Sequence, residues 1–281
     1  MPRLRAAVPV TSLAALALAL AAAPAGPERT RTPRPARNAV VPESPPAGTV
    51  RARLRRPPAR LTTRARIRAA SRYAASRAGT VAFAVLHDPG RVHGLRRTQT
   101  FPSASLVKTV LMVAELRRAK DRPLEPAARA RIEPMMTSSD NDAALASYAV
   151  VGKAGLMAAA RAARLRRFAV PASLFDAQVT AADQARLLLR VDGVVPPIHR
   201  RYARHLLSSV VAWQRWGIPT VASTRRLRAF FKGGWRPGLT HQAALLERGR
   251  RQLALAVLTT GSPSPDYAIA TIRGIATRVL R

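Results

Sequence analysis

The chain has 281 residues, with 48 Lys or Arg against 14 Asp or Glu, and its formal net charge is +34. This length is enough for one large domain or two small ones, and the apolar fraction of 48% allows a sizeable core and argues against wholesale disorder. Cysteine is absent, so disulfides, thiolate metal sites and a lipid-modified N-terminal cysteine are excluded.

The positive charge is almost entirely arginine. Only Lys108, Lys120, Lys153 and Lys232 are lysines, and the arginines are spread along the whole chain. Abundant arginine and alanine are typical of a GC-rich coding bias, and no finger, RNA-recognition or helix-turn-helix signature is present. We therefore predict no specific nucleic-acid partner. Lysine, unlike arginine, can lose its proton when its surroundings lower its pKa, so its few positions are informative.

The N-terminal residues 1–25 have the pattern of a secretory signal. Arg3 and Arg5 precede an apolar run from about Ala6 to Ala22, and Ala23-Pro24-Ala25 offers a small-x-small cleavage site. We expect an exported, extracytoplasmic protein, and an uncleaved membrane anchor is the alternative. Residues 26–60 are rich in Pro, Arg and Ala and are predicted to be a disordered linker. This cationic linker could contact anionic lipid or wall polymer, or serve only as a spacer.

The folded part is predicted to begin at residue 61, with a helix over 61–77. A strand over 80–87, a turn at Asp88-Pro89-Gly90 and a strand over 91–97 form a hairpin. Helical patterns follow over 105–119, 126–137, 141–150, 153–164, 180–190 and 197–212. Strands are predicted over 228–232, 241–247 and 252–259, and a final helix over 267–280.

This order predicts an α+β fold for residues 61–281. The N- and C-terminal segments would build one antiparallel sheet flanked by helices, and the central block would form an all-helical lobe. No internal repeat is visible.

One candidate site begins at Ser105-Leu106-Val107-Lys108, where a loop enters an apolar helix. Positions i and i+3 share a helix face, which puts the hydroxyl of Ser105 beside the amine of Lys108. A helix N-terminus also supplies free N–H donors, although a serine there can be an ordinary N-cap.

Two further motifs follow along the chain. Ser139-Asp140-Asn141 comes after a predicted helix, where it could also be a turn or an N-cap. Lys232-Gly233-Gly234 precedes Trp235 at the end of a predicted strand, where two glycines leave the strand edge bare, or form a plain turn.

Together and in this order, the motifs resemble the Ser-x-x-Lys, Ser-Asp-Asn and Lys-Thr-Gly signature of class A β-lactamases and penicillin-binding proteins. The hairpin VAFAVLHDPGRVHGL, the phrase FPSASLVKTVLM and the closing strands and helix are also similar to the class A β-lactamase family. The resemblance covers residues 61–281 and implies the β-lactamase/transpeptidase-like fold.

The resemblance implies that Ser105 is the nucleophile and Lys108 the group that takes its proton. Lys232 would be a second cation that lowers the pKa of Lys108 and holds the substrate carboxylate. The backbone N–H groups of Ser105 and Trp235 would hold the oxyanion.

It also implies that Ser139 relays a proton to the leaving nitrogen, that Asn141 holds Lys108 and the substrate amide, and that Gly233 and Gly234 line the substrate strand. Asp140 would brace its own loop. No metal and no cofactor are implied. The substrate would be a small β-lactam or a cell-wall peptide, and the protein a monomer.

The chain departs from the family in two places. Class A enzymes carry a glutamate that positions the deacylating water, but no glutamate occurs from Pro134 to Leu246, where Asp176 is the only acid near the loop. Gly233 also replaces the usual threonine or serine. We therefore expect weak deacylation.

Other residues are given structural readings. His241 is interpreted as structural, Trp213 and Trp216 as packing residues, and Trp235 as either a packing or a binding residue. Competing functions are a non-turnover cell-wall binding protein on the same fold and a polyanion binder.

Overall fold

The computed structural model describes residues 62–87 and 90–281, which lie in one compact unit, Leu54–Arg281. The predicted signal segment and linker lie outside the described residues, as do Asp88 and Pro89 of the predicted turn.

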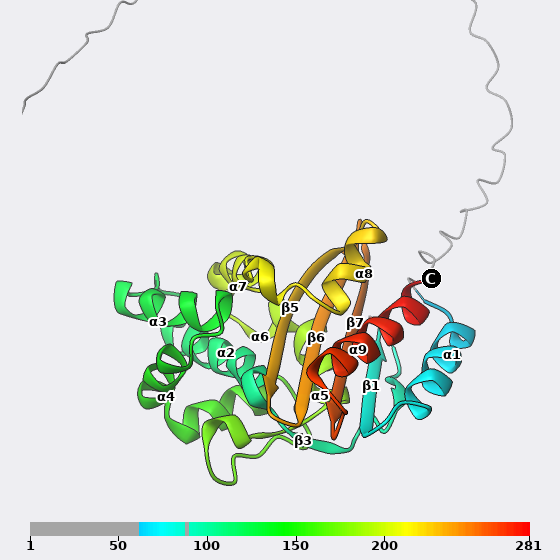
Figure 1. Ribbon diagram of the computed structural model, residues 1–281. Helices are drawn as coiled ribbons and strands as arrows, with labels where there is room; N and C mark the ends of the chain where they lie inside the picture. Colours follow the sequence, from blue (N-terminus) through cyan, green and yellow to red (C-terminus); the bar gives the residue numbers. More distant parts are fainter. Residues whose placement is uncertain (1–61, 88–89) are drawn as a thin grey trace, which may run out of the picture. The chain divides into compact units, whose positions relative to one another are not determined.

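The centre of this unit is an antiparallel five-stranded sheet in the order β2-β1-β7-β6-β5 (Figure 1). Its strands are β1 (Thr80–Leu86), β2 (His93–Leu95), β5 (Arg228–Arg236), β6 (Leu239–Arg248) and β7 (Arg251–Thr260). The N-terminal hairpin joins the C-terminal strands where β1 pairs with β7, with Phe83 opposite Val257. The predicted α+β fold, with one sheet built from both ends of the chain, is confirmed.

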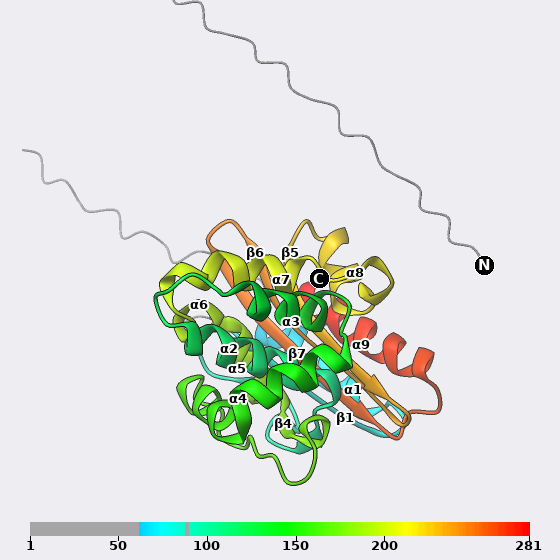
Figure 2. The same cartoon turned by 90° about the vertical axis from the view of Figure 1, so that its left-hand side faces the viewer.

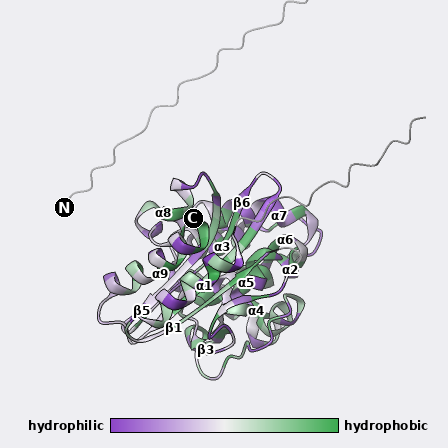
Figure 3. Cartoon of the chain, turned by 90° about the vertical axis from the view of Figure 1, so that its right-hand side faces the viewer, coloured by the Kyte–Doolittle hydropathy of each residue, from purple (hydrophilic) through white to green (hydrophobic). Residues whose placement is uncertain are grey.

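Both faces of the sheet are covered, which explains why its strands read as continuous apolar runs. On one face, Val81, Phe83 and Val85 pack with helices α1 (Arg64–Ala75), α8 (Ile218–Thr224) and α9 (Pro265–Leu280). On the other face, Ala82 and Ala84 pack with the helical lobe. Figure 3 colours the same unit by hydropathy and shows helices that carry both hydrophobic and hydrophilic stretches.

The helical lobe consists of α2 (Val107–Ala119), α3 (Pro126–Thr137), α4 (Asn141–Ala162), α5 (Ala181–Leu189), α6 (Val191–Val194) and α7 (Arg200–Ser208) (Figure 2). Helix α2 lies at its centre, and every residue from Val107 to Leu116 is buried. The amine of Lys108 is therefore carried into the interior by a helix whose first ten residues are buried on all sides. The helices predicted over 141–150 and 153–164 both lie within α4. The backbone at Gly152, between them, is not helical and has a φ of 68°.

Several boundaries differ from the sequence prediction. Strand β5 does not end at Lys232 but continues to Arg236, because Gly233 and Gly234 pair with Gln242 and His241 of β6. The predicted helix over 197–212 is shorter: a 3₁₀ turn over Pro197–His199 leads into α7, which ends at Ser208. Helix α8 and a two-stranded sheet of β3 (Thr100–Pro102) and β4 (Gln178–Thr180) were not predicted. The second strand is shorter than predicted, since β2 has only three residues.

Candidate active site

The candidate nucleophile lies on a sharp turn between β3 and α2. This turn, η1 (Ala104–Leu106), follows Ser103, whose N–H donates to the carbonyl oxygen of Ala177 at 2.7 Å. Ala104 has a φ of 43°, a left-handed conformation that costs a non-glycine residue about 1–3 kcal/mol. Ala104 and Leu106 are buried, whereas Ser105 between them is only partly so. The strained turn thus presents Ser105 at the start of α2.

Strand β5 passes directly against this turn, and Gly234 makes the approach possible. A Cβ at Gly234 would lie 2.9 Å from the backbone nitrogen of Ser105 and 3.0 Å from that of Leu106. Real Cβ atoms do not come that close to backbone, so no other residue fits without moving the turn. Gly234 therefore sets the position of Ser105 relative to β5, which is one of the two edge strands of the described sheet.

His241 fixes the same region from β6. It is fully buried, its Nδ1 accepts from the N–H of Thr259 at 3.2 Å, and its Nε2 lies 2.9 Å from the carbonyl oxygen of Pro102. Nε2 therefore carries the ring proton and donates to Pro102. Burial lowers the pKa of His241 to about 4, so the ring is neutral at pH 7. These contacts fit the structural interpretation of His241.

Lys108 projects from α2 toward the second motif. Its buried Nζ donates to the carbonyl oxygen of Ser139 at 2.5 Å, to the amide oxygen of Asn141 at 2.8 Å and to the hydroxyl of Ser139 at 3.2 Å. Burial lowers its pKa to about 8, although the charge of Asp140 opposes the change. Asp140 itself caps α4 through the N–H of Ala143 at 2.8 Å, as predicted for a bracing residue.

Lys232 reaches the same hydroxyl from β5. Its Nζ donates to the hydroxyl of Ser139 at 2.9 Å and to the carbonyl oxygen of Gly233 at 3.1 Å. Complete burial lowers its pKa well below the ordinary value, and the positive charge of Lys108 lowers it further. Two buried amines that share one hydroxyl cannot both stay protonated cheaply. One of the two amines therefore loses its proton more easily than an ordinary lysine, and the hydroxyl of Ser139 accepts from both.

The structure thus brings all three motifs together, from the start of α2, the start of α4 and strand β5. Ser105 is not among the hydrogen-bond partners of Lys108, whose donors are directed to Ser139 and Asn141. One of these bonds must be released before Lys108 can accept the Ser105 proton.

The loop before β4 places an aromatic ring beside the amine of Lys108. The Phe175 ring centroid lies 5.3 Å from Nζ of Lys108. The neighbouring Asp176 is directed elsewhere, since its carboxylate accepts from the hydroxyl of Ser173 at 2.6 Å and from the guanidinium of Arg236 at 2.7 Å. The bond from Ser173 and, after it, the bond from Arg236 lower the pKa of Asp176. Sequence analysis missed Phe175 and Arg236, because neither belongs to a motif.

Two aromatic rings surround the place where a side chain at Gly233 would lie. A Cβ there would lie 3.3 Å from the ring of Trp216 and 3.6 Å from that of Trp235. Trp235 makes edge-on contacts with Trp216 and Trp213, at centroid distances of 6.1 and 5.8 Å. A threonine at position 233 would press on this cluster. Trp216 packs as expected, but Trp213 is 67% exposed and Trp235 is 39% exposed.

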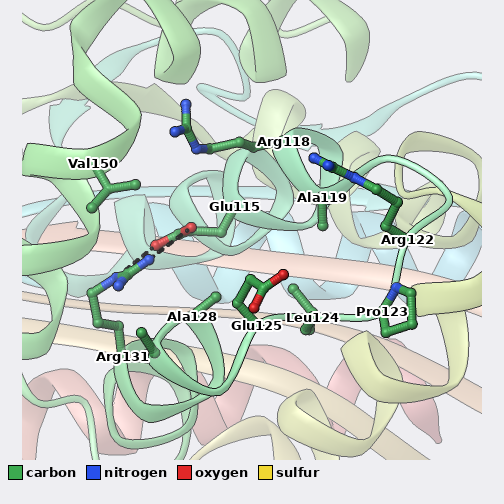
Figure 4. Close-up of a pocket in the computed structure, with 11 residues that line it drawn as sticks. Glu115, Arg118, Ala119, Arg122, Pro123, Leu124, Glu125, Ala128, Arg131 and Val150 are labelled. Carbon is green, nitrogen blue, oxygen red and sulfur yellow. Dashed lines mark hydrogen bonds and ion pairs between the residues drawn. The ribbon is translucent and has the colours of Figure 1, made fainter.

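A separate cavity of about 360 Å³ lies between α2 and α3, with Val150 of α4 at its rim (Figure 4). Its charged residues include Glu115, whose carboxylate is paired with Arg131 at 3.1 Å. None of the residues of the three motifs lines this cavity.

Comparisons with known proteins agree with the fold. The model of the beta-lactamase enzyme family matches residues 122–281. No curated protein matches the sequence. The β-lactamase of Sphaerobacter thermophilus DSM 20745 superposes with a TM-score of 0.67 at 18% identity, over 77% of this chain and 96% of that one.

Two further solved structures are similar. PBP-A has a TM-score of 0.68 at 16% identity and covers 77% of this chain and 95% of its own. The ancestral class A β-lactamase GNCA has a TM-score of 0.63 at 21% identity and covers 76% and 98%. At these identities the likeness shows the fold, whereas the family match spans more than half of the chain. The chain therefore belongs to the beta-lactamase enzyme family.

Proposed function

We propose that the protein is an exported acyl-serine hydrolase that acts on β-lactam or peptidoglycan-type amides through an acyl-enzyme on Ser105, with weak deacylation. The observation that carries the proposal is the pair of buried amines, Lys108 and Lys232, which share the hydroxyl of Ser139. Lys108 follows the turn that carries Ser105, and Lys232 belongs to the strand that passes against this turn.

Acylation would begin when neutral Lys108 takes the proton of the Ser105 hydroxyl, whose oxygen then attacks the amide carbonyl carbon. The resulting oxyanion would be held by the backbone N–H groups of Ser105 and Trp235. The proton on Lys108 would pass through Ser139 to the leaving nitrogen as the carbon–nitrogen bond breaks. Lys108 is then neutral again, and the acyl group remains on Ser105.

Substrate binding would switch the lysine pair into the reactive state. Lys232 is desolvated, and its pKa lies well below the ordinary value. A substrate carboxylate beside it would restore its charge, since an opposite charge favours the protonated amine. Protonated Lys232 would in turn hold Lys108 neutral, so that the base is generated where an anionic substrate is bound.

Weak deacylation is supported by the loop before β4. Phe175 lies beside Lys108, and Asp176 is engaged by Ser173 and Arg236. A water there lacks a carboxylate base, which typically contributes about 10²–10⁴ in rate. One structural neighbour, a variant of PBP-A, is described as an acyl-enzyme complex with penicillin G. That observation concerns PBP-A, and a trapped acyl-enzyme is what we propose for this chain.

The proposal is tested by labelling with a fluorescent penicillin and by following β-lactam hydrolysis in parallel. We expect a covalent label that forms faster than it is released and that Ser105→Ala abolishes. Lys108→Arg keeps the positive charge but cannot supply a neutral amine, so labelling should fall by at least about 10²-fold. Reversible binding without any covalent label would instead favour the non-turnover binding protein. Export is tested by the mass of the secreted chain, which should begin at Gly26.

A further inference from the structure

All three tryptophans of the chain lie in one cluster beside the candidate active site. The sequence contains three, Trp213, Trp216 and Trp235, and they contact one another edge-on through Trp235. Aromatic residues make up only 5% of the chain. Large indole rings are most often packed inside, so a group of them with two exposed members needs an explanation.

The cluster is attached to two parts of the site. Trp235 follows Gly234 on β5, one residue beyond the glycine that touches the Ser105 turn. Trp213 lies on the segment after α7, which is bonded to the two residues before the second motif. The N–H of Val211 donates to the carbonyl oxygen of Thr137 at 3.0 Å, and the side-chain amide of Gln214 donates to that of Ser138 at 2.8 Å.

The three rings divide into one that packs and two that are open. Trp216 fills the space beside Gly233 and packs against the apolar cluster under α8 and α9. Trp213 is 67% exposed and Trp235 is 39% exposed, although each has a large apolar surface. Packing thus accounts for Trp216 but leaves the exposure of the other two unexplained.

The position of the cluster indicates which half of a substrate it would meet. Gly233 adjoins Lys232, the proposed carboxylate-binding residue, and its Cα faces Trp216 and Trp235. Phe175, beside Lys108, belongs to a different loop. The indoles therefore adjoin the carboxylate-bearing half of the substrate, which leaves when Ser105 is acylated.

We propose that Trp213 and Trp235 form a subsite for a flat ring on the carboxylate-bearing, leaving half of the substrate. The inference rests on the proposed function, because that function defines the leaving half. Indole faces bind rings by offset or edge-on contact and bury a large area. Gly233 contributes to this subsite, because the side chain of a threonine there would compete with the indoles for space.

The test measures binding to Ser105→Ala, which cannot be acylated at that residue, through tryptophan fluorescence, which comes from this cluster alone. The ligands are N-acetyl-D-Ala-D-Phe, with a ring on the leaving half, N-phenylacetyl-D-Ala-D-Ala, with a ring on the other half, and N-acetyl-D-Ala-D-Ala. We expect the D-Phe peptide to bind about 5- to 50-fold more tightly than the other two. Trp213→Ala should remove that advantage, Trp213→Phe should retain most of it, and Leu145→Ala, at another exposed apolar residue, should leave it unchanged.

Equal affinity for the three peptides, or an advantage that survives both Trp213→Ala and Trp235→Ala, would overturn the subsite. This failure is distinguishable from failure of the proposed function. If the unaltered protein is acylated by penicillin but shows no ring preference, only the subsite is wrong. If the unaltered protein is not acylated and none of the three peptides binds, the proposed function is wrong, and the subsite that depends on it is wrong as well.

Discussion

Replacing Phe175 with glutamate should change the protonation of Lys108 in a calculable way. The Phe175 ring centroid lies 5.3 Å from Nζ of Lys108, and a glutamate carboxylate would occupy about the same place. Two opposite unit charges at that distance attract by about 3 kcal/mol at an effective dielectric constant of about 20. This energy favours the protonated amine and should raise the pKa of Lys108, now about 8, by about 2.

The assay is the pH dependence of penicillin acylation for Phe175→Glu and Phe175→Gln. Acylation needs neutral Lys108, so its rate should rise with pH through the pKa of that amine. The midpoint should move upward by about 2 in Phe175→Glu. Phe175→Gln has nearly the same shape without the charge, and removal of the cation–π contact should leave its midpoint unchanged or slightly lower. The same carboxylate should speed release of the acyl group by about 10²–10⁴.

An equal shift of the acylation midpoint in Phe175→Glu and Phe175→Gln would refute the electrostatic reasoning. So would an unchanged midpoint in Phe175→Glu, because it would mean that Lys108 is not the base whose titration limits acylation.

Three further predictions concern the surroundings of the site. Gly234→Ala should slow acylation by at least about 10-fold, because its Cβ would lie 2.9 Å from the backbone nitrogen of Ser105. Gly233→Ala should have a smaller effect, because the nearest contact of its Cβ would be the ring of Trp216, at 3.3 Å. Single-turnover kinetics of the two variants test this difference. His241 has a pKa of about 4 in the folded protein and about 6.5 in the unfolded chain, so the unfolded state binds more protons between pH 4 and 6.5. The free energy of unfolding should therefore fall by about 3 kcal/mol as the pH falls from 6.5 to 4. Urea titrations should show a flatter decline in His241→Gln. Asp176→Asn should leave the lifetime of the acyl-enzyme unchanged, because Asp176 is bonded to Ser173 and Arg236 rather than directed at the lysines; a longer lifetime would identify Asp176 as a deacylation base.

The three motifs could be predicted from the sequence because each combines a short spacing with a local structure. Ser105 and Lys108 share a helix face at i and i+3, and lysine is rare enough in this arginine-rich chain for Lys108 and Lys232 to stand out. The sheet was predictable in outline because its strands are apolar runs bounded by glycine and polar turns.

The remaining features depend on contacts between distant residues, which no local pattern encodes. Strand β5 continues through two glycines because β6 pairs with them, and the end predicted at Lys232 followed glycine propensity alone. Strands β3 and β4 have three residues each and exist through their mutual pairing. Phe175 approaches Lys108 from a loop 67 positions away, and the reason for Gly233 is a tryptophan at position 216.

The central claim is that the hydroxyl of Ser105, and no other, becomes acylated. Intact-mass analysis after exposure to penicillin G, followed by peptide mapping, tests it directly, with Ser103→Ala and Ser105→Ala compared side by side. We predict one added acyl group on the peptide that contains Ser105, retained in Ser103→Ala and lost in Ser105→Ala. An adduct on another residue, or one that persists in Ser105→Ala, would contradict the account.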